Sequence, residues 1–542
     1  MSPPPERSRA AVKPAPTPKA IAKLRAKRAR QGTRGWTVHL AVAGLVVALV
    51  ALVAELASGR GYQSGWWHYQ TGFTILRTAA PAAGVGAGLM LAQSGKASVK
   101  VLERAPRVGG NSGSFVLEGI HCDFGSHRLH PASEPHILAM IQDAVGPDLL
   151  WRPRHGRIRL KGRWIHFPLK PVDLLLRLPK GFTAHLLWDA ATKPFRRAPA
   201  GEPTFASVLY QGLGPAMSEN FYYPYMRKLW ALPPEELAVT LATRRVSGSS
   251  IGKIVRKILG QVPGFKKPQT GGFFFPKKGF GQICDALRTK AEAHGAEFLL
   301  DASVTAIEHA DGKVKAVRFR KGETETRIET DKIWSSLPIT SLVSFMDPPA
   351  PAPVAEAASR IRFRGMILIY LVLEQQQFTE YDAHYFPEYA VPISRLSEPK
   401  NYSASTEPKG VTVLCAELPC DPHEPLWALS DDELGAKLCE WLAGVGLPVT
   451  AKVRRTVTHR LGYAYPVYDR NFESDLAVMD RWVESIDGLL TFGRQGLFAH
   501  DNTHHALATA HGAVDCLNAD GSFDLSKWHG YRRIFETHVV ED

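Results

Sequence analysis

The sequence has few cysteines and none of the spacings with which cysteines bind zinc. Its six cysteines are scattered over 542 residues without a Cys-x-x-Cys pair. This pattern argues against a disulfide framework or a zinc ribbon, and it predicts reduced thiols in the protein core. The histidines His504, His505 and His511 lack the glutamate and the spacing of zinc hydrolases, so no metal site is predicted.

Most of the chain also lacks an excess of charge of either sign. The formal net charge is +14, but residues 1–35 hold ten Lys and Arg residues and one acid, so +5 remains for the other 507 residues. No nucleic-acid partner is therefore predicted for the body of the protein. Residues 1–35 are basic and rich in proline, and we expect them to form a disordered arm.

Residues 36–54 contain no formal charge and are dense in Val, Leu and Ala. Such a run is long enough to cross a bilayer once, so residues 36–56 are a candidate transmembrane helix. A cleaved signal peptide is disfavoured because the basic region before it is long and Glu55 intrudes near any cleavage site. With a genuine start, the chain is expected to be membrane-anchored by this helix. The alternative is a wrongly assigned start over residues 1–80 and a cytoplasmic protein.

The whole chain of 542 residues is too long for one hydrophobic core, and its 45% hydrophobic and 22% charged residues are typical of folded domains. Residues 86–94 are predicted to form a small-residue helix, and a β-branched strand follows that ends at Glu103. In a β-α-β unit that binds a dinucleotide, an acidic residue at this point accepts hydrogen bonds from the adenosine ribose. Glu103 is therefore a candidate ribose ligand.

The glycine fingerprint GxGxxG that should precede this acidic residue is largely missing. Counting back from Glu103 gives Ala79, Ala80, Pro81, Ala82, Ala83 and Gly84, so only the third glycine is present. Pro81 also removes a backbone N–H that could bind a pyrophosphate. A register on Gly84 and Gly86 restores two glycines but leaves a short helix. On this fragment alone, an ordinary buried α/β crossover is as good an interpretation as a dinucleotide site.

The residues after Glu103 are more specific. The string VLERAPRVGGNSGSF, from Val101 to Phe115, closely resembles the second half of the FAD fingerprint in the amine oxidase, protoporphyrinogen oxidase and phytoene desaturase superfamily. Its GGN, together with the later His127 and His130, also resembles UDP-galactopyranose mutase. The glycine pair lets backbone pass close to a diphosphate. The resemblance implies FAD as the cofactor.

Further blocks extend the resemblance from about Gly84 to Asn518. They are an aromatic helical block, a return into the FAD domain, a strand expected to close the dinucleotide sheet and a strand buried on both faces, at residues 222–237, 276–307, 332–338 and 361–373. In the family, backbone near Val304 contacts the adenine side of the cofactor. An ordinary strand of a β-α-β unit is the alternative for residues 304–307, and aromatic core packing is the alternative for most of the helical block.

Two arginines and a helix start complete the pattern. Arg395 lies in a segment that resembles the mutase strand whose arginine faces the flavin and the diphosphate, and Arg494 lies where a strand enters a glycine turn. A guanidinium can grip a phosphate or carboxylate through two hydrogen bonds, although a structural ion pair is the alternative for either residue. Asp501 or Asn502 is predicted to cap a helix over residues 506–517 and to direct its N–H groups at an anion or a flavin edge.

These patterns predict an α/β protein with a Rossmann-like FAD-binding domain assembled from discontinuous segments and an inserted α+β substrate domain. The expected FAD-binding segments are residues 70–135, 270–340 and 460–525. Residues 136–269 and 341–459 are expected to supply the substrate domain, and residues 526–542 a C-terminal tail. The predicted FAD-binding residues are Gly84, Glu103, Arg104, Gly109, Gly110, Asn111, His127, Val304, Gly493, Asp501 and Asn502, and the predicted catalytic residues are Arg395, Arg494 and His130.

The resemblance implies an FAD-dependent oxidoreductase that takes a hydride from a small organic substrate bound between the domains. The first alternative is a mutase-like isomerase of a sugar nucleotide, favoured by the GGN, the histidine pair, Lys228 and the two arginines. Phe498, His500 and Asp501 stand against it, because they replace tyrosines that contact the diphosphate in the mutase. The second alternative is a non-catalytic, membrane-tethered protein on a decayed flavin fold. The sequence indicates neither a particular substrate nor an oligomeric state.

Overall fold

The structure is a computed structural model, and it describes residues 72–77, 82–168, 173, 176–197, 201–245 and 271–540. The predicted basic arm, the candidate transmembrane helix at 36–56 and residues 79–81 lie outside these ranges. Of the helices in the described part of the chain, none has the length and apolar character to span a membrane.

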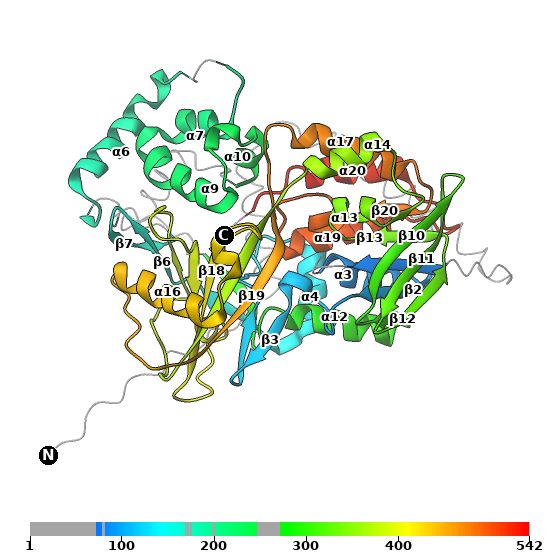
Figure 1. Ribbon diagram of the computed structural model, residues 1–542, viewed down its shortest axis with the longest axis horizontal. Coiled ribbons are helices and arrows are strands. Elements are labelled where there is room, and N and C mark those ends of the chain that lie inside the picture. Colours follow the sequence, from blue (N-terminus) through cyan, green and yellow to red (C-terminus); the bar gives the residue numbers. More distant parts are fainter. Residues whose placement is uncertain are drawn as a thin grey trace, which may run out of the picture. The chain divides into compact units, whose positions relative to one another are not determined.

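Five parallel strands form the sheet expected for the dinucleotide-binding domain. Their spatial order is β20-β13-β1-β2-β9, so strands that are far apart in the sequence lie side by side (Figure 1). The strands are β1 (Gly72–Arg77), β2 (Ser98–Glu103), β9 (Glu297–Leu299), β13 (Lys332–Ser335) and β20 (Leu489–Thr491). The α/β fold class, with its discontinuous assembly, is confirmed. β13 is the buried strand of this sheet that was expected in residues 332–338, although β20 rather than β13 forms the edge.

Helix α3 (Ala83–Ser94) follows β1 and crosses the sheet in close contact with its neighbours. A Cβ on Gly86 would lie 2.4 Å from a methyl of Leu507 in helix α19 (Thr503–Asp515), and one on Gly88 would lie 3.2 Å from Val101 of β2. The glycines of this helix therefore let it approach both α19 and the sheet. The helix begins three residues before the predicted start at residue 86.

Four further helices surround the parallel sheet, and the last of them corrects a prediction. They are α4 (Pro135–Val145), α12 (Gln282–Ala293), α17 (Phe472–Glu484) and α20 (Leu525–Phe535). Residues 526–542 were expected to be a tail, but α20 packs on α19 and buries Trp528 in the core of the domain. Trp528, Tyr531 and Phe535 recur at the spacing of one helix face, which explains why the segment folds.

A second sheet of four strands has the order β12-β11-β10-β14. Its strands are β10 (Ser303–Ala310), β11 (Lys313–Lys321), β12 (Thr324–Glu329) and β14 (Met346–Asp347). The interpretation of residues 304–307 as an ordinary β-α-β strand is wrong, because β10 pairs antiparallel with β11 and only β9 joins the parallel sheet. Val304 still lies near β2, since the Ala302 N–H donates to the Glu103 carbonyl at 2.9 Å.

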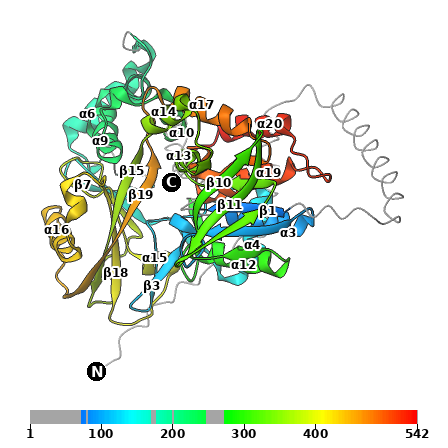
Figure 2. The ribbon, with the colours of Figure 1, turned by 45° about the vertical axis from the view of Figure 1, so that its right-hand side comes forward.

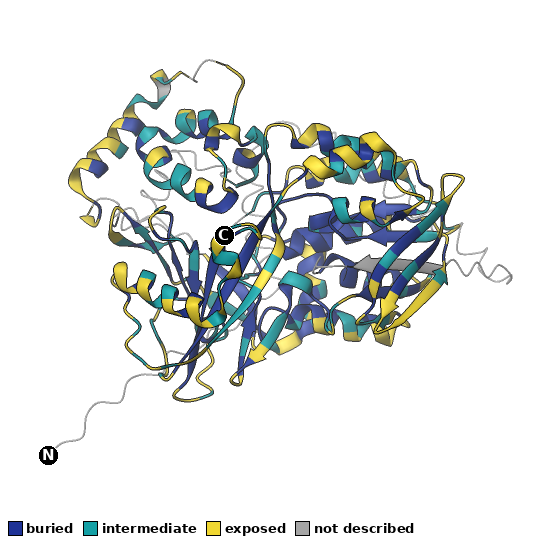
Figure 3. Ribbon diagram, viewed as in Figure 1, coloured by how far each residue is buried: buried dark blue, intermediate teal, exposed yellow. Residues whose placement is uncertain are grey.

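The inserted segments build a seven-stranded sheet with the order β19-β15-β18-β17-β16-β6-β7. The strands are β6 (Gly156–Leu160), β7 (Arg163–Phe167), β15 (Phe363–Leu373), β16 (Ala383–Tyr385), β17 (Arg395–Ser397), β18 (Thr412–Pro419) and β19 (Val453–Pro466). β15 is buried along nearly its whole length, as its continuous apolar sequence predicted (Figure 3). β19 crosses the boundary predicted at residue 460, so that boundary is misplaced.

The remaining elements are a helical lobe and short connections. The lobe holds α6 (Lys180–Thr192), α7 (Phe205–Leu213), α8 (Pro215–Met217), a π-helical turn (Ser218–Tyr222), α9 (Tyr223–Trp230) and α10 (Val239–Arg245). Elsewhere lie β3 (Ser114–Leu117), β4 (Ile120–Asp123), β5 (Leu149–Pro153), β8 (Gly272–Pro276), α13 (Ile339–Ser344), α14 (Ala352–Arg360), α15 (Pro399–Ser403), α16 (Asp431–Gly444) and α18 (Gly493–Gly496).

All six cysteines are unpaired and five are buried, which confirms the predicted core thiols.

The turn into β20 provides a stability test with a matched control. Gly488 and Gly446 both have positive φ, at 85° and 77°. A Cβ on Gly488 would lie 2.0 Å from the Asp331 carbonyl oxygen, whereas one on Gly446 would meet nothing within 4 Å. We expect Gly446→Ala to lower the free energy of unfolding by about 1–2 kcal/mol, from backbone conformation alone. Gly488→Ala should lower it by about 2 kcal/mol more, because the backbone at Asp331 must move to make room for the new Cβ. Urea unfolding of both variants measures this, and equal losses would contradict it.

His384 in β16 provides a test of how stability depends on pH. It is 2% exposed. Burial, and then the charge of Arg157, lowers its pKa to about 3. The unfolded chain protonates this ring near pH 6.5, so its contribution to stability is present above that pH and is lost as the pH falls. Between pH 7 and 5 the loss is about 2 kcal/mol. We expect His384→Gln to remove that part of the pH dependence of urea unfolding, and an unchanged dependence would refute it.

Candidate functional site

A large cavity lies where the parallel-sheet domain meets the seven-stranded sheet and the helical lobe. It spans about 1280 Å³, including space open to solvent, and is lined by residues of β15, β17, β18, β19, α9, α10, α18 and α19. Six of the residues predicted from the sequence line it, namely Asn111, His127, Arg395, Arg494, Asp501 and Asn502. These six residues come from three distant stretches of the chain, which the fold brings to one space.

The other predicted cofactor residues lie outside the cavity lining, toward the parallel sheet. Glu103 is buried at the end of β2, where its Oε1 accepts the Ala105 N–H at 3.0 Å, and Arg104 beside it is exposed. Gly84 is buried in the first turn of α3. Gly493 packs against that turn, since a Cβ on it would lie 2.8 Å from the Ala83 Cβ. The first turn of α3 and the end of β2 are the parts of a β-α-β unit where a dinucleotide lies.

The GGN turn can exist only with glycine. Gly109 and Gly110 have φ angles of 106° and 51°, and a Cβ on Gly109 would lie 2.8 Å from the Gly113 Cα. This turn places Asn111 and Ser112 at the cavity. Its surface carries no side chain at the two glycines, which leaves backbone open to a cofactor diphosphate. The turn fits the flavin nucleotide that the resemblance implied.

A second glycine turn holds the GGN turn in place. A Cβ on Gly281 would lie 2.3 Å from the Ser114 nitrogen. The Asp123 carboxylate joins the two segments, because it accepts from Ser114 Oγ at 2.5 Å and from the Phe280 N–H at 2.8 Å. Burial raises the pKa of Asp123 to about 7, against the lowering effect of these hydrogen bonds. The PKKGFGQ block thus supports the candidate cofactor loop from behind.

The start of α19 faces the cavity. Asn502 is its N-cap and forms a capping box with His505, as was predicted for Asp501 or Asn502. The helix itself begins at Thr503, three residues earlier than expected, and Ser112 Oγ lies 3.0 Å from Thr503 Oγ1. The free N–H groups and positive dipole of this first turn favour a negatively polarised ligand. They fit the electron-rich edge of a flavin ring.

Arg395 and Arg494 have different environments. Arg395 donates to both Glu417 oxygens at 2.9 Å, so the ion pair considered as an alternative is present. Glu417 also accepts the Ser126 N–H at 2.8 Å. Arg494 instead donates to the carbonyls of Asp501 at 2.7 Å and Ala464 at 3.1 Å. Burial, with the nearby charge of Arg245, lowers the pKa of Arg494.

The two predicted histidines separate. His127 lines the cavity and stacks on Phe280 with ring centroids 5.3 Å apart. Burial, and then the charges of Arg395 and Arg494, lower its pKa to about 3, so its ring is neutral at physiological pH. His130 is absent from the cavity lining, and its Nδ1 accepts the Ala132 N–H at 3.1 Å. The geometry therefore gives His127 better access to a ligand than His130.

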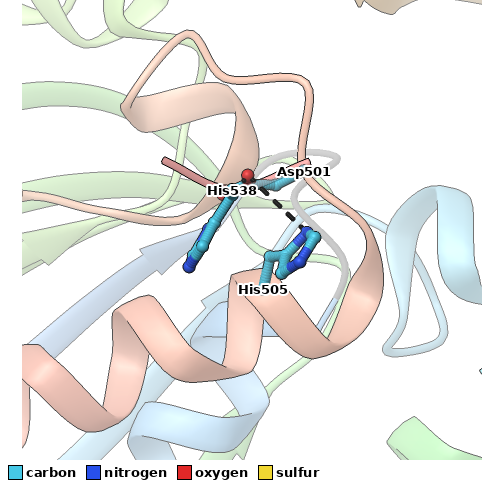
Figure 4. A group of neighbouring side chains, drawn as sticks. All are labelled: Asp501, His505 and His538. Atoms are coloured by element: carbon cyan, nitrogen blue, oxygen red, sulfur yellow. Dashed lines mark hydrogen bonds and ion pairs between the residues drawn. The ribbon is translucent and has the colours of Figure 1, made fainter. Parts of the chain in front are cut away.

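A buried histidine cluster lies behind the start of α19 (Figure 4). Asp501 Oδ1 is 3.3 Å from His538 Nδ1 and 3.9 Å from His505 Nδ1. These three side chains are close enough to be considered as metal ligands. The rings of His505 and His538 are nearly parallel, at 16° and 4.2 Å, and parallel rings side by side do not direct their lone pairs at one point. We describe the group as a hydrogen-bonded cluster that fixes the residue before the N-cap.

Several cavity residues were not found from the sequence. They are Arg128, Tyr225, Arg245, Glu417 and Tyr465. Arg245 donates to His500 Nδ1 at 3.1 Å and lies over the rings of Trp230 and Tyr465. Arg128 sits between the two predicted histidines, so that motif contained a usable signal. The others have no local motif, because only the pairing of distant strands and helices brings them to the cavity.

Comparison with known proteins agrees with this geometry. The structure is similar to that of reduced UDP-galactopyranose mutase, with a TM-score of 0.72 and 19% identity over 87% of this chain and 98% of that one. It is also similar to cyclohexylamine oxidase from Brevibacterium oxydans IH-35A, with a TM-score of 0.56 and 16% identity over 82% and 98% of the two chains. Putrescine oxidase gives a TM-score of 0.54 and 16% identity over 82% and 98%. At these identities the likeness shows the fold.

The family described as flavin containing amine oxidoreductase matches residues 82–515, which is most of the chain. The match begins just before α3 and ends with α19, so it includes the glycine turns, the cavity and both arginines. The protein belongs to the family of flavin containing amine oxidoreductases, and its cofactor is FAD.

Proposed function

We propose that the protein is an FAD-dependent oxidoreductase that takes a hydride from an organic substrate carrying a carboxylate or phosphate group. The observation that carries this proposal is the state of Arg245 and Arg494. Both line the cavity, and neither forms an ion pair with a carboxylate of the described residues. Both guanidinium groups are half-buried, and a partly desolvated guanidinium without a counter-charge favours an anionic ligand.

The charge balance of the cavity supports the same substrate class. Its lining holds four arginines, at positions 128, 245, 395 and 494, and two carboxylates, Glu417 and Asp501. Arg395 is paired with Glu417, and Arg128 lies 3.4 Å from the buried Asp382 carboxylate outside the lining, so the charges of Arg245 and Arg494 remain against Asp501. A protonated amine would meet a net positive field in this space. Within a family named for amines, this cavity is therefore better suited to an anion.

Bound FAD supplies the two-electron acceptor. The chain supplies binding and orientation. The first turn of α19 offers N–H groups toward the cofactor, and Arg245 and Arg494 hold the anionic group of the substrate. Neutral His127 offers a hydrogen bond and, with a pKa of about 3, is too weak a base to retain a proton. An apolar wall of the cavity is formed by Leu229, Met366 and Leu368, and it excludes water from the space beside them.

The arginine assignment is tested with simple anions. We expect sulfate and oxalate to perturb the flavin absorbance of the purified protein, and Arg494→Gln to weaken this binding about 10- to 100-fold, because a hydrogen-bonded charge pair is lost. Arg227→Gln is the matched control, since Arg227 is exposed on α9 and does not line the cavity. Anion binding that is equally weak in both variants, or absent in the wild type, would contradict the assignment.

A sugar-nucleotide isomerase is the second candidate, and two tyrosines favour it. Tyrosines are missing after Arg494, where Phe498 and His500 are buried, but Tyr225 and Tyr465 line the cavity from other elements. Phenol and guanidinium groups together are good donors for a diphosphate. The objection that the sequence raised to a mutase is therefore weaker in the structure.

Pre-reduction separates the two candidates. An isomerase that needs reduced flavin should convert UDP-galactopyranose only after dithionite treatment, and Tyr465→Phe should slow it about tenfold through one lost hydrogen bond. The oxidoreductase should leave this sugar unchanged, and its oxidised flavin should bleach anaerobically with a carboxylate or phosphate substrate. Product chromatography and flavin absorbance measure the two outcomes. Conversion by the reduced protein would replace the oxidoreductase proposal with the isomerase.

A further inference from the structure

Helix α6 presents an apolar face to solvent. Ala184, Leu187, Trp188 and Ala191 are all exposed and recur at helical spacing, so they form one stripe along the helix. Leu187 is 59% and Trp188 69% exposed, and Phe195 just beyond the helix is 85% exposed. The helix lies at the outer edge of the helical lobe in both views (Figures 1 and 2). We call Ala184, Leu187, Trp188, Ala191 and Phe195 the α6 face.

The opposite side of the helix carries its one acidic residue. Asp189 is buried, lies 3.6 Å from Arg196 and accepts the Ala216 N–H at 2.8 Å. The usual order of an amphipathic surface helix, apolar inward and charged outward, is thus reversed at its centre. The hydrogen bond to Ala216 fixes this orientation, because turning the apolar stripe inward would expose the Asp189 contacts and break them.

Basic residues outnumber acids around the α6 face, although Glu388 lies at the nearby turn between β6 and β7, where it is paired with Arg159 and accepts the Gly162 N–H. Between residues 176 and 197 the only acid is buried Asp189, whereas Lys180, Lys193 and Arg197 flank the stripe without a carboxylate partner among the described residues. The turn between β6 and β7 adds exposed Lys161 and Arg163, and Lys161 Nζ lies 5.7 Å from the ring of Phe182 in α6. Exposed Trp, Phe and Leu surrounded by lysine and arginine match the interface of an anionic bilayer.

We propose that the α6 face docks on the surface of an anionic lipid membrane. Trp188, Leu187 and Phe195 enter the headgroup region, and the flanking lysines and arginines contact lipid phosphates. A tryptophan at such an interface keeps its ring in the apolar boundary and its N–H in the polar layer. The α6 face shares no residue with the cavity lining, and the proposal does not depend on the substrate.

A position-specific measurement on the full chain tests the proposal. Ala184→Cys is labelled with an environment-sensitive fluorophore and mixed with vesicles of phosphatidylcholine with or without phosphatidylglycerol, and with nitroxide-labelled lipid as quencher. We expect a blue shift and quenching with phosphatidylglycerol that decrease at high salt. Glu323→Cys, exposed in the β11–β12 turn, is the control and should not be quenched. The unsubstituted chain gives the background from the native cysteines, of which Cys439 is the one not fully buried.

Substitutions complete the test. Trp188→Ala and Lys193→Gln should each lower vesicle partitioning about fivefold, while Ile534→Ala, which removes an equally exposed apolar side chain from α20, should not. A vesicle-bound protein whose label at position 184 stays unquenched would assign binding to another segment and overturn the proposal. Absence of vesicle binding would also overturn it, and would leave the α6 face as a contact for a protein partner.

Discussion

The cofactor end of the protein depends on close backbone contacts that only glycine permits. The GGN turn folds back so tightly that a Cβ on Gly109 would lie 2.8 Å from Gly113, and Gly281 from a distant segment fills the space behind it. Asp123 accepts hydrogen bonds from both segments. Because the interior is close-packed, any added atom at this point would displace the turn that presents Asn111 and Ser112. The cofactor loop and its support are therefore one packed unit.

Local patterns in the sequence predicted the elements near this unit well. The strand ending at Glu103, the glycine turn after it and the cap at Asn502 each depend on a few neighbouring residues, and each lies as expected. Buried β15 was recognised because both of its faces are apolar. In these cases backbone geometry and local burial determine the structure, and the residue types at each position indicate both the backbone geometry and the burial.

The errors concern long-range pairing. The sequence of residues 304–307 suits a parallel strand as well as the antiparallel strand that forms, and the choice depends on pairing with β11, which these four residues do not encode. Helix α20 is short and polar apart from one apolar face, and that face becomes buried only once the helix packs on α19, which the local sequence does not indicate. Arg245 and Glu417 reach the cavity through the packing of α10 and the pairing of β18 with β17. No local motif carries that information.

Electrostatics connects the fold to the choice of substrate. Arg395 is held by both oxygens of Glu417, so its charge is compensated and its position is fixed. Arg245 and Arg494 are held mainly by neutral groups, a histidine nitrogen and two carbonyls, which orient the guanidinium groups without neutralising them. A partly desolvated charge of this kind raises the free energy of the protein without ligand. A bound anion lowers that free energy and a neutral molecule does not, so the packing that orients the arginines is the physical basis for the negatively charged substrate that we propose.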